Sequence, residues 1–146
     1  MKQDIERLKA RLRAANPDDP SFFSWMEEFV PEAEKLENPT SMFRIIFELF
    51  EANPQSDFGC PGPLVHFIEA HYPKYLDELK NSIGQSPTPH TLWMLNRILN
   101  SRLNPQDRSD LTSILRSASE NPRVDEEVRD CAIEFLELQQ EHDLNH

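Results

Sequence analysis

Apolar residues recur at three- and four-residue spacing along most of the chain, which is the period of an amphipathic α-helix. In residues 2–15, Leu8 and Leu12 fall on one such stripe, and Asn16-Pro17 ends the pattern. Residues 40–52 are apolar on almost every side, so we predict that this helix is buried on most of its surface. Further helices are predicted at residues 20–36, 63–71, 73–83, 89–101, 105–119 and 123–141.

Prolines mark the boundaries of these predicted helices. The chain has twelve Pro and three Gly, a balance that suits short helices beginning and ending at prolines better than the tight turns of β-sheets. We expect Thr40 and Gly84 to act as the N-cap and the C-cap of their helices. Pro31 is expected to break or kink its helix, and the tail from Glu141 to fray. The pair Asn-Pro occurs at five predicted boundaries, beginning at residues 16, 38, 53, 104 and 121.

The length and the repeated short helices predict how the chain is organised. At 146 residues, 38% of them hydrophobic, the chain has the size and apolar content of one domain, residues 1–146. We predict an all-α fold of seven to eight short helices, stacked as irregular helical hairpins. Residues 124–136 resemble the inner helix of HEAT repeats, which favours an α-solenoid over a closed bundle. That resemblance implies that Asp125 and Arg129 tie adjacent repeats, while the stack is filled by Val128, Ala132 and Leu136.

The charge of the chain narrows the classes of partner. The net charge is −11, which argues against nucleic acid and against an anionic membrane surface but permits a basic protein partner. The other interpretation is that the acidic surface serves solubility alone. Two segments concentrate the acids: residues 17–37 hold seven acids and one Lys, and residues 120–146 hold nine acids and two Arg. Residues 2–15 are instead basic, and we expect this helix to pack on the body rather than to bind a membrane.

The chain shows no signal for export. The first residues lack the apolar core of a secretion signal, and no run approaches the 18 apolar residues of a membrane span. We therefore expect a cytoplasmic protein that does not bind a membrane. Cys60 and Cys131 are far apart and form no CxxC pair, so we expect free thiols rather than a zinc site or a disulfide.

The candidate catalytic and metal-binding residues do not form a recognisable site. His66 and His71 are five residues apart, whereas two ligands on one helical face need a spacing of three or four, and Glu69 between them does not complete a set. Cys60 with His66 could form a nucleophile pair, but no third residue at a recognisable position orients the histidine. We expect neither an enzyme, nor a metal, nor a cofactor.

Asn96 and Arg97 are polar residues inside the apolar helix at residues 89–101. Buried groups of this kind must find hydrogen-bonding partners. We expect both to bind Asp side chains or backbone groups of a neighbouring helix and so to fix the stacking. The alternative is that they line a ligand pocket.

Two sequence stretches, PGPLVH at residues 61–66 and WMLNRI at residues 93–98, resemble small all-α bacterial immunity proteins of contact-dependent and polymorphic toxin systems. The resemblance implies a cytoplasmic inhibitor that binds one cognate toxin domain, often a basic nuclease. The alternative is an α-solenoid adaptor or scaffold that binds a peptide or protein partner. For the surface that contacts the partner we predict the acids that flank the central stretch, namely Asp57, Glu69, Asp77 and Glu78. The alternative contact faces are the acidic segments at residues 18–37 and 120–143.

Overall fold

The structure is a computed structural model that describes residues 2–59 and 61–144. Every regular element in these residues is helical, which confirms the predicted all-α class. The elements are α1 (Lys2–Ala14), α2 (Phe22–Glu34), the 3₁₀-helix η1 (Pro39–Met42), α3 (Phe43–Ala52), α4 (Pro63–Glu69), α5 (Leu76–Gln85), α6 (Pro89–Leu99), α7 (Pro105–Glu120) and α8 (Glu126–Leu144).

The chain divides into two compact units, Met1–Glu78 and Leu79–His146, with the boundary in the first turn of α5. We call them unit 1 and unit 2 and describe each by itself. That the two units make one domain stays a prediction.

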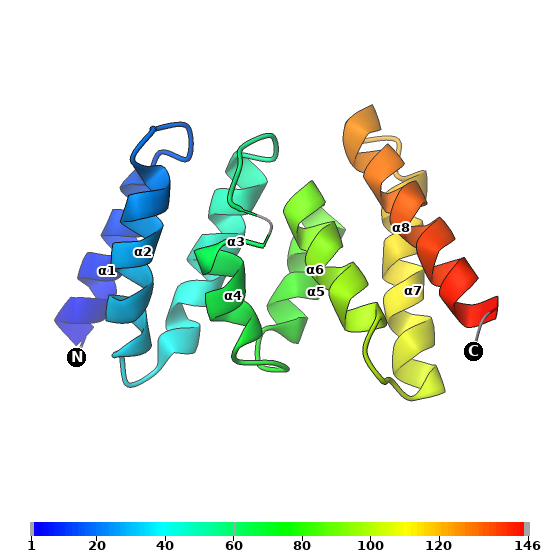
Figure 1. Cartoon of the computed structure of the whole chain (residues 1–146), viewed down its shortest axis with the longest axis horizontal. Helices are drawn as coiled ribbons and strands as arrows, with labels where there is room; N and C mark the ends of the chain where they lie inside the picture. Colours follow the sequence, from blue (N-terminus) through cyan, green and yellow to red (C-terminus); the bar gives the residue numbers. More distant parts are fainter. Residues whose placement is uncertain (1, 60, 145–146) are drawn as a thin grey trace. The chain divides into compact units, whose positions relative to one another are not determined.

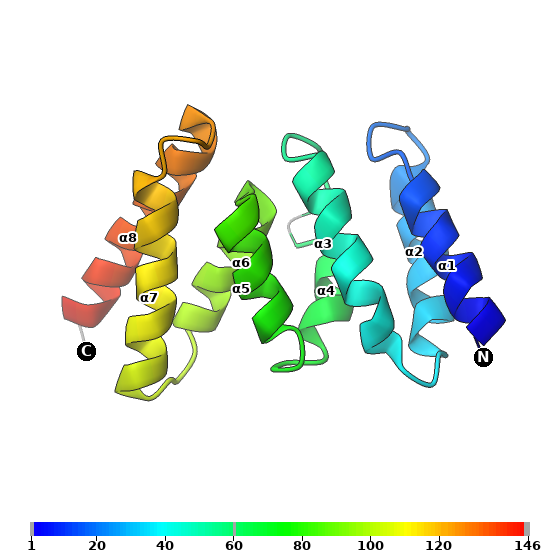
Figure 2. The same ribbon diagram turned by 180° about the vertical axis from the view of Figure 1, so that it is seen from behind.

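Unit 1 contains two helical hairpins, α1–α2 and α3–α4, arranged in two layers. Helix α1 packs on α3 and α2 packs on α4, and the two opposite views show α2 and α4 on one side of the unit with α1 and α3 on the other (Figures 1 and 2). Aromatic rings fill the space between the layers. The Phe58 ring lies 4.8 Å from Phe50 and 5.6 Å from Phe22, and Phe43 lies 5.7 Å from Phe67.

Helix α3 lies within the segment predicted to be buried on most of its surface, and the structure confirms that burial. Six of its ten residues, among them Phe43, Phe47 and Phe50, are buried. A helix that is apolar on most sides needs partners on most sides. Helix α3 therefore forms the centre of the apolar core of unit 1.

Unit 2 is built around the α7–α8 hairpin, with α6 packed on both of its helices. Buried leucines of α6 and α7 belong to the same core as the smaller side chains of α8, Val128 and Ala132, which are also buried. Leu136 of the same stripe is only half-buried. The core is mainly aliphatic, in contrast with unit 1, and its leucines include Leu92, Leu95, Leu99, Leu111 and Leu115.

Prolines and short polar side chains begin several helices, as the sequence predicts. Pro63, Pro89 and Pro105 are the first residues of α4, α6 and α7, where the missing N–H costs nothing. The Thr88 hydroxyl accepts a hydrogen bond from the Thr91 backbone N–H at 3.1 Å, and the Thr91 hydroxyl accepts one from the Thr88 N–H at the same distance. This reciprocal capping box fixes the beginning of α6.

The predictions for Thr40 and Gly84 were wrong, and of the break or kink predicted at Pro31 the break does not occur. Thr40 caps no helix, because the chain enters α3 through η1 and the Thr40 hydroxyl donates to the Asn38 side chain. Pro31 does not end α2: its missing N–H removes one hydrogen bond, and the buried Phe29 and Ala33 hold the last turn. Gly84 lies inside α5, which ends one residue later.

The boundaries of α5 and α8 also differ from the prediction. Helix α5 begins at Leu76 and not at Pro73, because hydrogen-bonded turns occupy the residues that precede it. The Tyr72–Pro73 bond is cis. Helix α8 begins at Glu126 and extends to Leu144, although the tail from Glu141 was expected to fray. Side-chain hydrogen bonds to α6 and α7 hold its last turns, and the sequence pattern alone could not reveal these contacts.

Candidate protein-interaction surfaces

The four predicted contact residues all belong to unit 1. Asp57 lies in the loop between α3 and α4, where its carboxylate accepts a hydrogen bond from the Gly59 N–H at 2.8 Å. Glu69 is the last residue of α4, and Asp77 and Glu78 lie in the first turn of α5. Helix α4 has seven residues, so at 1.5 Å per residue it is about 10 Å long. Asp57 therefore precedes one end of α4, while Glu69 occupies the other.

These four acids also differ in burial. Asp57 and Asp77 are exposed, whereas Glu69 and Glu78 are half-buried and each places one carboxylate oxygen out of contact with solvent. Burial raises the pKa of Glu78, and the positive charge of Arg44 opposes that shift. Asp57 and Asp77 are thus the members of the set most available to a partner, and their role in binding stays a prediction.

Helix α8 of unit 2 carries a longer acidic surface than the predicted set. One side of it buries Val128, Ala132 and Gln139. The opposite side carries five exposed acids at alternating spacings of three and four, which places them in one row along the helix. Within the described part of the chain, none of the five forms an ion pair. We call this row the α8 ridge: Glu127, Asp130, Glu134, Glu137 and Glu141.

Exposed apolar side chains flank the α8 ridge. Ile133 is 40% exposed and Leu138 is 51% exposed, and their positions on the helical wheel fall on either side of the acidic row. An exposed apolar side chain is common by itself. Two of them on the borders of an acidic row give α8 both charge and apolar area with which to contact a partner.

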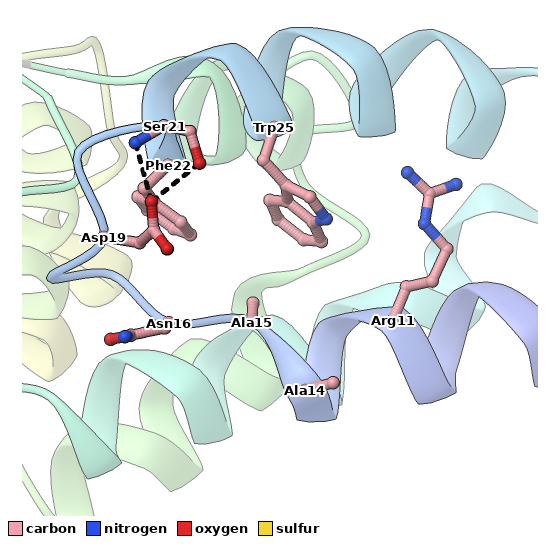
Figure 3. A pocket seen from close by; sticks show the side chains of 8 residues that line it. All are labelled: Arg11, Ala14, Ala15, Asn16, Asp19, Ser21, Phe22 and Trp25. Atoms are coloured by element: carbon pink, nitrogen blue, oxygen red, sulfur yellow. Dashed lines mark hydrogen bonds between the residues drawn. The ribbon is translucent and has the colours of Figure 1, made fainter.

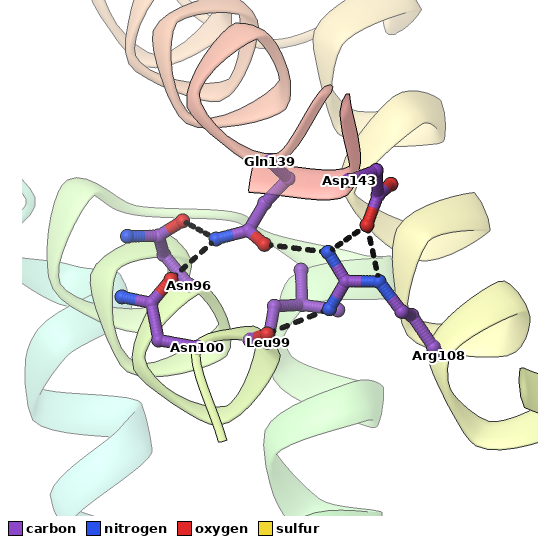
Figure 4. A network of polar contacts seen from close by, with 6 residues as sticks. All are labelled: Asn96, Leu99, Asn100, Arg108, Gln139 and Asp143. Carbon is purple, nitrogen blue, oxygen red and sulfur yellow. Dashed lines mark hydrogen bonds and ion pairs between the residues drawn. The ribbon is translucent and has the colours of Figure 1, made fainter. Parts of the chain in front are cut away.

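A polar network fixes α8 within unit 2 (Figure 4). The Gln139 side-chain amide, which is buried, donates to the side-chain oxygens of Asn96 at 2.7 Å and Asn100 at 2.8 Å. The Arg108 guanidinium of α7 donates to the Gln139 side-chain oxygen at 2.9 Å and to the Leu99 carbonyl at 2.7 Å. It also pairs with the Asp143 carboxylate near the end of α8. The α8 ridge therefore stands on a helix whose inner side is hydrogen-bonded to both α6 and α7.

The network tests the expectation about Asn96 and Arg97. Asn96 is buried and binds a neighbouring helix, as predicted, although its partner is an amide and not an Asp. Arg97 is exposed, with its guanidinium 6.0 Å from the centre of the Trp93 ring, so the prediction of a buried arginine was wrong. Adjacent residues on a helix point about 100° apart, and an inward Asn96 turns Arg97 outward.

Sequence reasoning missed Gln139 and Arg108. Gln139 continues the buried stripe of α8, four residues after Phe135 and seven after Ala132, so its register indicated an inward polar side chain. Arg108 carried no such sign, because its contacts come from residues that are distant in sequence.

In unit 1, the outer side of α2 is a second acidic face. The exposed residues Phe23, Glu27, Pro31 and Glu34 follow one another at spacings of three and four. Phe23 is 41% exposed and adds an aromatic ring to this side. The face is shorter than the α8 ridge and carries fewer acids in line.

A pocket of about 280 Å³ lies between the end of α1 and the start of α2 in unit 1 (Figure 3). The half-buried Trp25 is stacked between Phe22 at 5.6 Å and Phe29 at 5.0 Å. At its mouth, one oxygen of Asp19 accepts hydrogen bonds from the Ser21 hydroxyl at 2.7 Å and the Ser21 N–H at 2.8 Å. These bonds lower the pKa of Asp19. The other lining residues are Arg11, Ala14, Ala15 and Asn16.

Of the two cysteines predicted to be free thiols, the structure describes Cys131. Cys60 lies outside the described residues, so its proposed pairing with His66 has no structural description. Cys131 on α8 is free and half-buried. Burial, and then the negative charge of Glu134, raise its pKa to about 11, which makes the thiolate scarce at neutral pH.

The histidines considered as metal ligands lie in different surroundings. His66 is exposed on α4, whereas His71 is half-buried, with its ring 5.6 Å from Phe43 and 5.7 Å from Phe67. Residues 2–59 and 61–144 bring together no group of three His, Cys, Asp or Glu side chains suited to a metal ion. In the same residues, no helix is both long and apolar enough to cross a bilayer.

Comparisons with protein-family models, with curated proteins and with solved structures find no match to this chain.

Proposed function

We propose that this protein is a non-enzymatic cytoplasmic inhibitor, an immunity protein that binds and neutralises a bacterial toxin domain with a basic surface. The observation that carries the proposal is the α8 ridge, an unpaired row of exposed carboxylates on a helix that is fixed from behind. The resemblance of residues 61–66 and 93–98 to immunity proteins supports the same conclusion. The toxin class that fits best is a nuclease, because a nuclease presents lysines and arginines to hold phosphate.

The charge of the ridge would act mainly on the rate and specificity of association. A row of like charges attracts a partner of opposite charge over the distance of a Debye length, about 8 Å at physiological salt. Each exposed ion pair adds only ~0–1 kcal/mol to stability. Affinity therefore needs apolar contacts as well, and Ile133 and Leu138 are placed to provide them.

The polar network behind α8 would reduce the cost of binding. A surface that must be ordered on association loses affinity to the entropy of ordering. Gln139 and Arg108 already hold the inner side of α8 to the rest of unit 2. The ridge can thus meet a partner with little rearrangement of its backbone.

A helical adaptor that binds a peptide or protein partner is the second candidate. The observation that favours it is the two-layered arrangement of hairpins in unit 1, since layered helical hairpins expose long surfaces for peptides. An adaptor and an inhibitor both bind a protein. They differ in whether binding abolishes the activity of the partner.

The test is coexpression with the toxin domain encoded by the neighbouring gene, if that gene specifies a large secreted protein with a variable C-terminal domain. We expect this chain to restore growth and to elute with the toxin domain as one complex on a sizing column. Growth inhibition that persists, with no complex on the column, would contradict the proposal. A complex that forms without restoring growth would favour the adaptor.

A matched pair of variants tests the ridge itself. The double variant Glu134→Lys and Glu137→Lys reverses two charges on the α8 ridge, and Glu27→Lys with Glu34→Lys makes the same change in net charge on α2. We expect the α8 variant to slow association and to lose protection, while the α2 variant keeps both. Equal losses in the two variants would show that only net charge matters.

A further inference from the structure

We infer that a groove between α5 and α7 in unit 2 binds the C-terminal residue of a protein partner, with an aliphatic side chain on the groove floor and the free α-carboxylate beside Lys80. The groove has a volume of about 280 Å³, and all of its lining residues belong to unit 2. It shares no residue with the α8 ridge, so it can be tested whether or not the proposed function holds.

The floor of the groove is aliphatic. Ile83 of α5 and Ala118 of α7 are buried, and Ile114 of α7 is half-buried and lines the same space. Figure 2 shows α5 and α7 next to each other within unit 2. An aliphatic side chain that enters the groove would exchange water for contact with these residues, and this exchange favours binding.

Gly84 keeps the groove open. It lies in α5, its φ is not positive, and a Cβ atom at this position would meet nothing within 4 Å. Neither the backbone nor the packing therefore requires glycine there, although glycine is a poorer helix former than alanine. Because Gly84 lines the groove, a longer side chain at this position would extend into it. The consequence of the missing side chain is the open space of the groove.

The polar groups that line the groove favour an anion. The chain carries 26 acidic and 15 basic residues, yet the groove lining that the structure describes contains Lys80 and no carboxylate. Lys80 is half-buried and forms no ion pair with any described residue. Ser113 and Ser117 add exposed hydroxyl groups, and Asn121 adds side-chain N–H groups. All of these groups can donate hydrogen bonds, and a carboxylate can accept several of them at once.

A C-terminal residue carries an aliphatic group and a carboxylate on one Cα atom, which suits an aliphatic groove with one lining cation. Pockets for drug-sized ligands begin at about 300 Å³, so about 280 Å³ accommodates a single residue better than a nucleotide or a cofactor. Gly84, Ser113 and Ser117 are exposed, so the groove opens to solvent and leaves room for the rest of the partner chain. Capture of a C-terminal carboxylate is a recurring mode of peptide recognition.

The direct test is an NMR titration of the whole chain with the peptide acetyl-Gly-Gly-Leu, which ends in a free carboxylate. The backbone N–H of Gly84 serves as the reporter, and a Gly84→Ala variant assigns it among the three glycines of the sequence. We expect a saturable shift with a dissociation constant on the order of millimolar, as suits one residue in an open groove. The same peptide ending in a carboxamide should bind about fivefold more weakly, because it lacks the charge. Acetyl-Gly-Gly-Gly keeps the carboxylate without the aliphatic side chain, and we expect no saturation with it.

Variants of the charged residue locate the carboxylate. Lys80→Gln should weaken the acid peptide about fivefold and leave the carboxamide peptide unchanged, so that the two peptides bind alike. Lys80→Arg keeps the charge and should restore the preference for the acid. The control is Arg116→Gln, which removes an exposed positive charge from α7 outside the groove and should preserve that preference.

Variants of the glycine locate the side chain. Gly84→Leu places a side chain in the groove and should abolish binding, with the Ser117 backbone N–H as the reporter. The control is Asn81→Leu, which adds the same side chain to an exposed position of α5 outside the groove. Leucine is a good helix former, so both variants should keep the helical circular dichroism spectrum of the parent.

Several outcomes would overturn the assignment of the groove, and none of them depends on a toxin. The first is no saturable shift with the acid peptide, and the second is equal affinity for the carboxamide peptide. Equal weakening by Lys80→Gln and Arg116→Gln would mean that only net charge matters. Undiminished binding by Gly84→Leu would place the peptide elsewhere. Hexanoate that binds more tightly than the peptide would make the groove a site for a small free acid and not for a protein C-terminus.

Discussion

The side-chain amide of Gln139 on α8 donates a 2.7 Å hydrogen bond to the Asn96 side chain on α6, and both residues are buried. We predict that Gln139→Ala destabilises the protein by about 1–3 kcal/mol, because it leaves the Asn96 oxygen without its partner in a buried position. Urea unfolding followed by circular dichroism measures the change. The matched control is Gln140→Ala, an exposed neighbour on the same helix, for which we expect a change within about 0.5 kcal/mol.

The same pair offers a test of coupling. Asn96→Ala combined with Gln139→Ala should cost less than the sum of the two single changes, since each single change already breaks the shared hydrogen bond. Strict additivity would mean that the two side chains contribute independently, and that the network does not act as one unit.

The half-buried carboxylate of Glu78 predicts a pH-dependent stability. Burial raises its pKa in the folded state above the ordinary value of 4.5, because burial penalises the charged form. A group whose folded pKa is raised contributes most favourably below its unfolded pKa, and that contribution is lost as the pH rises through the folded pKa. Ionised Glu78 thus works against folding at neutral pH.

We therefore expect Glu78→Gln to raise the melting temperature at pH 7 and to have no such effect near about pH 3, where the carboxyl is protonated in both states. Melting curves of the variant and the parent at several pH values measure this difference. The control is Asp77→Asn, which changes the exposed neighbour in the same helical turn. A gain for Glu78→Gln that is the same at both pH values would contradict the assigned cause.

The Cys131 thiol should react slowly while the protein is folded. Its pKa is raised from 9.0 to about 11, which lowers the thiolate fraction about a hundredfold at neutral pH. Alkylation by iodoacetamide at about pH 8, followed by mass spectrometry in a Cys60→Ser variant, measures the rate. We expect the rate to rise sharply in urea. Equal rates in the folded and unfolded protein would show that the thiol is not protected.

Helix boundaries were predictable from the sequence wherever a local rule governs them. Prolines at the first position of α4, α6 and α7 follow from the fixed geometry of proline, whatever else packs nearby. Thr40 failed as a cap because a 3₁₀ turn precedes α3, and Gly84 failed because α5 continues past it. Both predictions relied on local preferences of only ~1 kcal/mol, which are too small to fix a helix boundary by themselves.

The candidate interaction surfaces were only partly predictable. The acidic segment at residues 120–146 was visible as composition, and helical periodicity could place its acids in one row. The anchoring of that helix was not visible, because Arg108 meets Gln139 across 31 positions of sequence. Trp25 and Asp19 are only six residues apart, but the pocket that they line also needs residues of α1. The sequence does not predict the packing of α1 against α2.

Two glycines give opposite predictions for the same substitution. A Cβ atom built on Gly62 would lie 1.4 Å from the Phe58 carbonyl oxygen and 2.6 Å from the carbonyl carbon, so the close approach of these two backbone segments excludes any side chain. We expect Gly62→Ala to cost about 3 kcal/mol, at the upper end of the range for overpacking, because backbone atoms must move. At Gly84, inside α5, a Cβ atom meets nothing within 4 Å.

Gly84→Ala should therefore stabilise the protein by about 0.5 kcal/mol, since alanine loses less backbone entropy in a helix than glycine does. Urea unfolding of both variants measures the pair under identical conditions. Were Gly84→Ala destabilising, residue 84 would not be helical in solution, and its original assignment as a helix terminus would regain support. A neutral Gly62→Ala would mean that the loop before α4 rearranges freely, and that the approach of Phe58 to Gly62 does not hold the start of that helix in place.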